Sequence, residues 1–285
     1  MTDNNKKTFA PFLKGLSLTL ILILFGLGAI KIIANTSNSS TEKAIARKLA
    51  KENENFKKLK FDLVDPELAP KGIHDAVLLG YNIMIDTQKY AKDFVGNKLN
   101  CTNCHFSGGN TTGGENGSIS LAAIASAYPC YNSRSQKVLS LGERINSCFE
   151  RSLNGKPLAL GSQEMVALEA YLHWISRNYP IYAPIPWRGL KELKAEKTLS
   201  PSNGKLVYER TCALCHGKEG EGGTNIPPVF GDRAYNDGAG MNDLGTLASF
   251  IHANMPYENP TLTVEEAFDV AAYIMEKPRP HFDKE

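Results

Sequence analysis

The side chains with the clearest chemistry are two cysteines and a histidine in the order C-x-x-C-H, at Cys101, Cys104 and His105. This is the attachment signature of c-type haem: each thiol can form a thioether to a haem vinyl group, and the histidine can bind the iron. The same pattern recurs at Cys212, Cys215 and His216. A zinc site would need two converging thiol pairs and no histidine directly after each pair. Two copies of the motif in a chain with only 6 cysteines therefore predict two covalently bound haem c groups.

A haem held by histidine on one face needs a ligand, or an open position, on the other face. Met255 lies 39 residues after His216 and directly before a proline, between two expected helices. Histidine and methionine together raise the potential of haem iron, which suits electron transfer. The sequence therefore favours Met255 as the distal ligand of the second haem, with Met241 as the competitor.

The first motif has no methionine at a comparable distance, but Cys148 lies 43 residues after His105. A thiolate ligand donates charge to iron and lowers its potential. Arg144 and Ser152 stand four residues to either side of this cysteine, so the three share one stripe of a helix, and the arginine favours the thiolate. We predict Cys148 as the distal ligand of the first haem. The alternatives are a buried free cysteine or a disulfide with Cys130.

The stretch around this cysteine, residues 144–158 (RINSCFERSLNGKPL), resembles the signature of the dihaem thiosulfate dehydrogenase family, which also contains tetrathionate reductases. Residues 128–134, 238–241 and 253–256 fit the same family, and the resemblance spans about residues 80–282. It implies an active-site haem with His and Cys ligands and an electron-transfer haem with His and Met ligands. It also implies that two thiosulfate ions and one tetrathionate ion are interconverted, with transfer of two electrons.

These substrates are small dianions that carry sulfonate groups. Arg134 and Arg144 can bind them through forked, charge-assisted hydrogen bonds, and Ser152 can donate one more hydrogen bond. The central S–S bond of tetrathionate is a disulfide analogue, so Cys148 can attack it as in thiol–disulfide exchange. These four residues are the candidate catalytic set.

Two other functions fit part of the pattern. A membrane-tethered dihaem electron carrier would have no substrate and would need no arginine–cysteine stripe. A haem subunit of a sulfur-oxidising complex also uses a cysteine ligand, but it needs a protein partner. The net charge of +2 gives no indication of nucleic-acid binding. The expected redox partner is a small cytochrome c or a membrane quinol/quinone-linked enzyme.

The residues that must be positioned lie in or beside segments with helical patterns. These patterns predict an all-α chain of two tandem cytochrome c-like domains. Helices are expected over residues 75–87, 140–154, 162–177, 204–210, 243–253 and 264–276. Ser140 with Glu143, and Thr263 with Glu266, form capping boxes at two of these starts. No convincing strand alternation is present, and the glycine-rich segment 106–118 is expected to be a loop.

The domain boundaries follow from prolines and charge. The first haem domain is expected over residues 66–178, a proline-containing linker over 179–201 and the second haem domain over 202–285. A polar and charged segment, residues 35–65, precedes them.

Residues 1–34 are typical of a signal segment or a membrane anchor. Residues 15–30 carry no charge and follow a basic flank, and the apolar run extends to Ala34 if Lys31 snorkels. This gives about 20 residues, which a bilayer core requires. Because no clean cleavage site follows, an uncleaved anchor is favoured over a cleaved signal peptide. The basic flank should stay inside, which predicts a periplasmic protein tethered to the inner membrane.

Overall fold

The computed structural model describes residues 59–112 and 119–283, and also positions 41, 43–45, 47, 48 and 51, which are helical and exposed. The expected anchor or signal segment, residues 1–34, lies outside the described residues. The chain divides into two units, residues 1–58 and 59–285, and the second holds both haem motifs. Within the described part of the chain, no helix is both long and apolar enough to cross a membrane.

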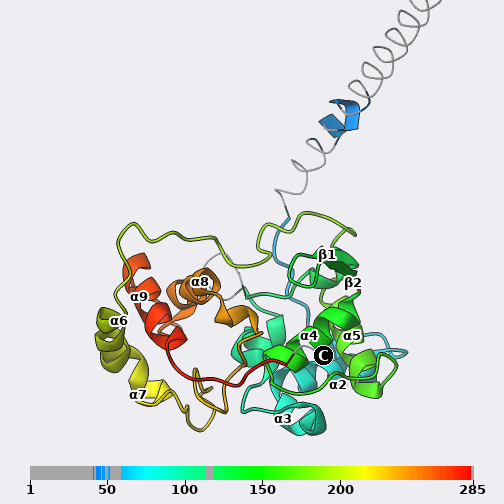
Figure 1. Cartoon of the computed structure of the whole chain (residues 1–285). Coiled ribbons are helices and arrows are strands. Elements are labelled where there is room, and N and C mark those ends of the chain that lie inside the picture. The colour runs from blue at the N-terminus through cyan, green and yellow to red at the C-terminus, as the bar shows by residue number, and fades with distance from the viewer. Residues whose placement is uncertain are drawn as a thin grey trace, which may run out of the picture. The chain divides into compact units, whose positions relative to one another are not determined.

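Helices dominate the second unit, so the expected helical fold class is confirmed (Figure 1). They are α2 (His74–Ile85), α3 (Thr87–Tyr90), α4 (Leu141–Arg151), α5 (Gln163–Trp174), α6 (Pro201–Val207), α7 (Ala213–His216), α8 (Leu244–Asn254) and α9 (Val264–Met275). Short 3-10 turns lie at Pro66–Leu68, Lys92–Phe94, Cys101–Asn103, Phe106–Gly109, Ile124–Ala127 and Gly240–Asn242, and a π-helical turn, Tyr208–Cys212, joins α6 to α7. Part of the segment expected to be a loop, Phe106–Gly109, is therefore a helical turn.

The expectation that the chain contains no strand is wrong. Strands β1 (Cys130–Asn132) and β2 (Lys137–Leu139) pair antiparallel, with Cys130 opposite Leu139. The turn between them is fixed locally, because Asn132 accepts a hydrogen bond from the Ser135 N–H at 2.9 Å. Each strand has only 3 residues, which is too short for an alternating pattern to reveal. The turn of this hairpin carries Arg134.

The two haem domains share one framework, in which the first long helix packs across the last. In the first domain α2 packs against α5, and in the second α6 packs against α9. Both crossings need a glycine. A Cβ added to Gly80 would lie 2.0 Å from the Ala167 carbonyl oxygen, and one added to Gly204 would lie 1.9 Å from that of Asp269. The close backbone approach at each crossing is therefore open only to glycine.

Each crossing lies in its own apolar core. Phe149, Met165 and Tyr171 are buried in the first core, and Tyr208 and Val270 are buried in the second. The cores touch through the segment between α7 and α8: the side chains of Tyr235 and Ala239 belong to the first core, and Met241 packs against both. This segment joins the two domains along the boundary that the haem motifs face.

Candidate active site

The first C-x-x-C-H motif is arranged for covalent haem attachment. Burial raises the pKa of Cys101 to about 11 and that of Cys104 to about 12, which keeps both thiols neutral. A thioether carries no charge, so such a site suits it. The Nδ1 of His105 donates to the Ile119 carbonyl at 3.1 Å, which leaves Nε2 free to bind metal. Burial also lowers the pKa of His105 and so keeps the ring neutral.

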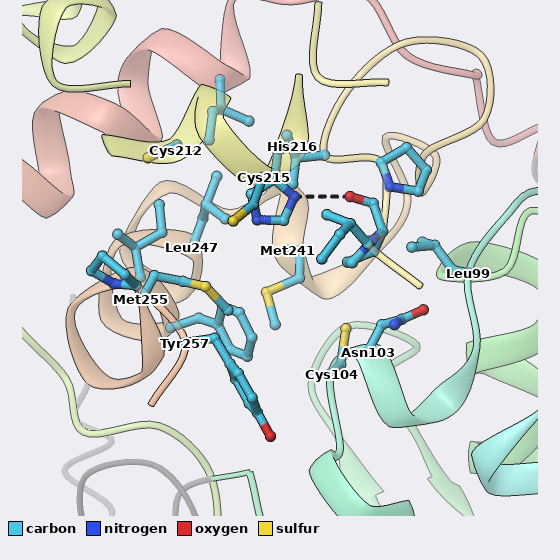
Figure 2. A pocket seen from close by; sticks show the side chains of 18 of the residues that line it. Leu99, Asn103, Cys104, Cys212, Cys215, His216, Met241, Leu247, Met255 and Tyr257 are labelled. Atoms are coloured by element: carbon cyan, nitrogen blue, oxygen red, sulfur yellow. Dashed lines mark hydrogen bonds between the residues drawn. The ribbon is translucent and has the colours of Figure 1, made fainter. Parts of the chain in front are cut away.

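The second motif repeats this proximal arrangement. The Nδ1 of His216 donates to the Pro227 carbonyl at 2.9 Å, and burial lowers the pKa of His216. Its ring faces a cavity of about 600 Å³, into which the side chains of Met241 and Met255 also point (Figure 2). Two thiols, a neutral imidazole, thioethers and largely apolar walls form a donor set that fits a c-type haem.

This cavity extends to the first domain. Cys104 and Phe106 stand on its wall, opposite the second-domain residues (Figure 2 shows Cys104). The Phe106 ring packs edge-on against Tyr257, with ring centroids 5.0 Å apart, and against Phe250 at 6.2 Å. The two attachment motifs therefore line one cavity from opposite sides, and this arrangement suits short-range electron exchange between two haems.

Helix α4 brings Arg144 and Cys148 to the first motif. The helix begins at a capping box, in which Ser140 and Glu143 bond reciprocally. One turn further, Arg144 Nη1 donates to Cys148 Sγ at 2.8 Å. The negative charge of Cys148 raises the pKa of Arg144, and it also contributes to the raised pKa values of Cys101 and Cys104. Cys148 therefore lies beside the first attachment site.

Arg134 reaches the same region from the hairpin turn. Partial desolvation lowers its pKa, and the positive charges of Arg151 and Arg144 lower it further, while Cys148 acts in the opposite direction. Its Nη1 donates to the Gly238 carbonyl at 3.5 Å. The guanidinium groups of Arg134, Arg144 and Arg151 thus lie close enough for Arg134 to be repelled by the other two. Arg134 and Arg144 are also attracted to Cys148. Arg151 was not predicted from the sequence, although it stands seven residues after Arg144 on the same helix and that spacing could have indicated it.

Ser152 and Cys130 have less direct relations to this cluster. Ser152 is the C-cap of α4, and its backbone N–H donates to the Cys148 carbonyl at 2.9 Å. Cys130 accepts a hydrogen bond from Arg188 Nη2 at 3.5 Å. None of the 6 cysteines forms a disulfide, so the alternative of a Cys130–Cys148 disulfide is wrong.

Comparisons with known proteins agree with this architecture. Residues 88–181 match the family model "SoxA/TsdA, cytochrome c domain", and residues 200–274 match "Cytochrome C oxidase, cbb3-type, subunit III". The thiosulfate dehydrogenase of Allochromatium vinosum is 35% identical over 76% of this chain and 83% of its own length. The chain belongs to the thiosulfate dehydrogenase family. As a member of this family with two matched cytochrome c domains, it carries two covalently bound c-type haems.

Some relatives extend well beyond the region that matches this chain. The enzyme of Thiomonas intermedia is 42% identical over 72% of this chain and 66% of its own length. The solved structure "Thiosulfate dehydrogenase (TsdBA)" of Marichromatium purpuratum superposes with a TM-score of 0.72 and 33% identity, over 78% of this chain and 50% of that one. The chain thus spans about two thirds of the first relative and half of the second.

Proposed function

We propose that this chain interconverts thiosulfate and tetrathionate, with Cys148 as the reacting group and with electrons exchanged through the second haem domain. The observation that carries the proposal is the 2.8 Å contact between Arg144 Nη1 and Cys148 Sγ beside the first haem motif. The two thiosulfate dehydrogenases named above, at 35% and 42% identity, support the choice of substrate.

The proposed ligand sets differ between the two haems. His105 and Cys148 would hold the iron in the first domain, and His216 and Met255 would hold it in the second. Met241 and Met255 both line the cavity that His216 faces. Met255 directly follows α8 and packs only against the second core, whereas Met241 packs against both cores, so Met255 is the proposed ligand. Each haem, when bound, supplies a one-electron carrier, so two haems match the two electrons of the reaction.

The chain's own residues account for binding and bond exchange. Arg134 and Arg144 bind sulfonate oxygens through charge-assisted hydrogen bonds. The Cys148 thiolate attacks a central sulfur of tetrathionate, which releases one thiosulfate dianion and leaves an S-thiosulfonate on the cysteine. Two electrons then return the cysteine to its thiolate and release the second thiosulfate. The reverse order of steps forms tetrathionate. Ser152, at the end of the same helix, is the fourth member of the proposed set.

An optical assay of the purified holoprotein tests this function. Thiosulfate alone should reduce the haems, and tetrathionate should reoxidise them. The Cys148→Gly variant should keep both haems attached and respond to neither anion. The matched control, Cys130→Ala, removes the other thiol that accepts a bond from an arginine and should respond as the wild-type protein does. An intact protein that responds to neither anion would be an electron carrier, and the proposal would fail.

The location and redox partner are also proposed. Covalent attachment of haem c in bacteria takes place outside the cytoplasm, which supports a periplasmic protein. The uncharged run over residues 15–30 supports a tether to the inner membrane, and a small cytochrome c or a quinol/quinone-linked enzyme would be the redox partner. An alkaline wash of isolated membranes tests the tether: the full-length chain should stay bound, and a chain without residues 1–34 should be released.

A further inference from the structure

Two buried polar groups where the two domains meet lack a well-formed hydrogen bond within the described part of the chain. No hydrogen bond of ordinary geometry reaches the hydroxyl of Tyr235 or the Nη1 of Arg279, although Tyr235 is only 7% exposed. Burial raises the pKa of Tyr235, and the guanidinium of Arg279 is close enough to oppose that rise. A buried donor that is left unpaired costs about 1–3 kcal/mol, and a charged one costs more. An acceptor from outside the described residues would remove this cost.

The two groups are held side by side. The guanidinium carbon of Arg279 lies 4.5 Å from the centroid of the Tyr235 ring. The Nη2 of Arg279 donates to the Ile274 carbonyl at 3.0 Å, which fixes the guanidinium at the end of α9. Because Nη2 is used in this way, Nη1 is the donor that remains available beside Tyr235.

The missing partner should be an anion, because one of the two donors is a charged guanidinium. No carboxylate of the described residues forms an ion pair with Arg279. Asp237 is near enough for its charge to be felt, but both of its oxygens are used: Oδ2 pairs with His281 Nδ1 at 2.6 Å, and Oδ1 accepts from the Phe282 N–H at 2.8 Å. The place for the anion is indicated by Tyr235, which lines the cavity that His216 and Met255 share with Cys104.

We propose that Tyr235 and Arg279 bind a propionate carboxylate of the haem attached to Cys212 and Cys215, because Arg279 follows the last helix of that domain. Cys104 of the first motif lines the same cavity and also contributes to the raised pKa of Tyr235, so the test must tell the two haems apart. A haem presents two propionates as the only charged groups on its edge, and a carboxylate accepts well from an O–H and a guanidinium N–H together. The site also joins the two domains, because Tyr235 belongs to the apolar core of the first domain and Arg279 follows the last helix of the second.

Redox titration of the holoprotein, monitored by electron paramagnetic resonance, tests the charge of Arg279. In Arg279→Gln the propionate loses its compensating charge, which favours ferric iron. The reduction equilibrium of the second haem should fall about tenfold, which is about 59 mV for a one-electron couple. The first haem should keep its potential. Lys277→Gln is the matched control, because it removes a cation two residues earlier that stacks on Tyr273 instead, 4.2 Å from the ring centroid.

Resonance Raman spectroscopy tests the hydroxyl separately. Tyr235→Phe removes one oxygen and keeps the ring beside Arg279, so the propionate bending band of one haem should shift with a smaller change in potential. Arg279→Lys should restore most of the potential. The second haem is identified as the one whose signal changes in Met255→Gly.

Unchanged bands and potentials in both Tyr235→Phe and Arg279→Gln would overturn the proposal, as would a change confined to the first haem. If Arg279→Gln does not fold, Tyr235→Phe decides alone. No outcome involves thiosulfate, so failure here leaves the proposed function standing.

Discussion

The two haem domains are alike on the proximal side of the haem site and differ on the distal side. In both, a C-x-x-C-H histidine donates Nδ1 to a carbonyl, and two helices cross at a glycine. On the proposed distal side, the first domain carries the contact of Arg144 with Cys148, whereas the second carries the thioethers of Met241 and Met255. The shared framework suits a haem in each domain, and under the proposed function the residues that differ separate substrate chemistry from electron transfer.

The largest effect should come from making the first distal side resemble the second. Cys148→Met removes the nucleophile, leaves Arg144 without its sulfur partner and replaces a thiolate donor by a thioether. We expect thiosulfate turnover to fall by about 10³-fold or more, in the range that loss of a nucleophile produces, and the potential of the first haem to rise. Steady-state rates and redox titration measure the two effects. Turnover within tenfold of wild type would contradict the assignment of Cys148.

The next effect concerns the shared framework. In Gly80→Ala and Gly204→Ala the new methyl group would overlap a backbone carbonyl at the helix crossing. Each should lower the free energy of unfolding of its own domain by about 3 kcal/mol or more, because the backbones must separate. Urea unfolding followed by hydrogen exchange measures this domain by domain. Gly72→Ala and Gly223→Ala are matched controls, because a Cβ at either position meets nothing within 4 Å.

A framework of this kind is only partly visible in the sequence. The haem motifs are local patterns, and the helix starts at Ser140 and Thr263 are set by capping boxes within four residues, so both were predicted correctly. The glycine crossings depend on contacts between residues far apart in the chain, such as Gly80 and Ala167, and no local pattern reveals them.

The candidate site shows the same division between local and long-range information. The contact of Arg144 with Cys148 follows from helical spacing and is present. The hairpin that carries Arg134 was missed, because its strands are too short to show a period. The fit of Arg134 near α4 depends on tertiary packing against residues such as Gly238, which lies 104 positions away.

A third prediction separates substrate binding from the nucleophile. Arg144→Gln keeps an amide donor one turn from Cys148 but removes the positive charge. We expect kcat/KM for thiosulfate to fall about 10²-fold, with a large part of the change in KM, because a charge-assisted hydrogen bond contributes about 1.5–3 kcal/mol. Arg188→Gln is the control, since that arginine donates to Cys130. Equal losses in the two variants would mean that positive charge in general, and not the contact with Cys148, supports the reaction.

The smallest effect on turnover should come from the distal side of the second domain, where the two methionines can be separated. Met255→Leu keeps the apolar volume and removes one thioether, so the potential of the second haem should fall and electron exchange with the redox partner should slow, within about tenfold. Substrate binding at the first domain should not change. Met241→Leu should preserve the ligand spectrum of the second haem, because Met241 packs between the two cores. If Met241→Leu alters that spectrum and Met255→Leu does not, the ligand is Met241. The distal ligand of the second haem would then come from the segment between α7 and α8, which packs against both cores. The second haem site would then depend on both domains, and not on the second domain alone.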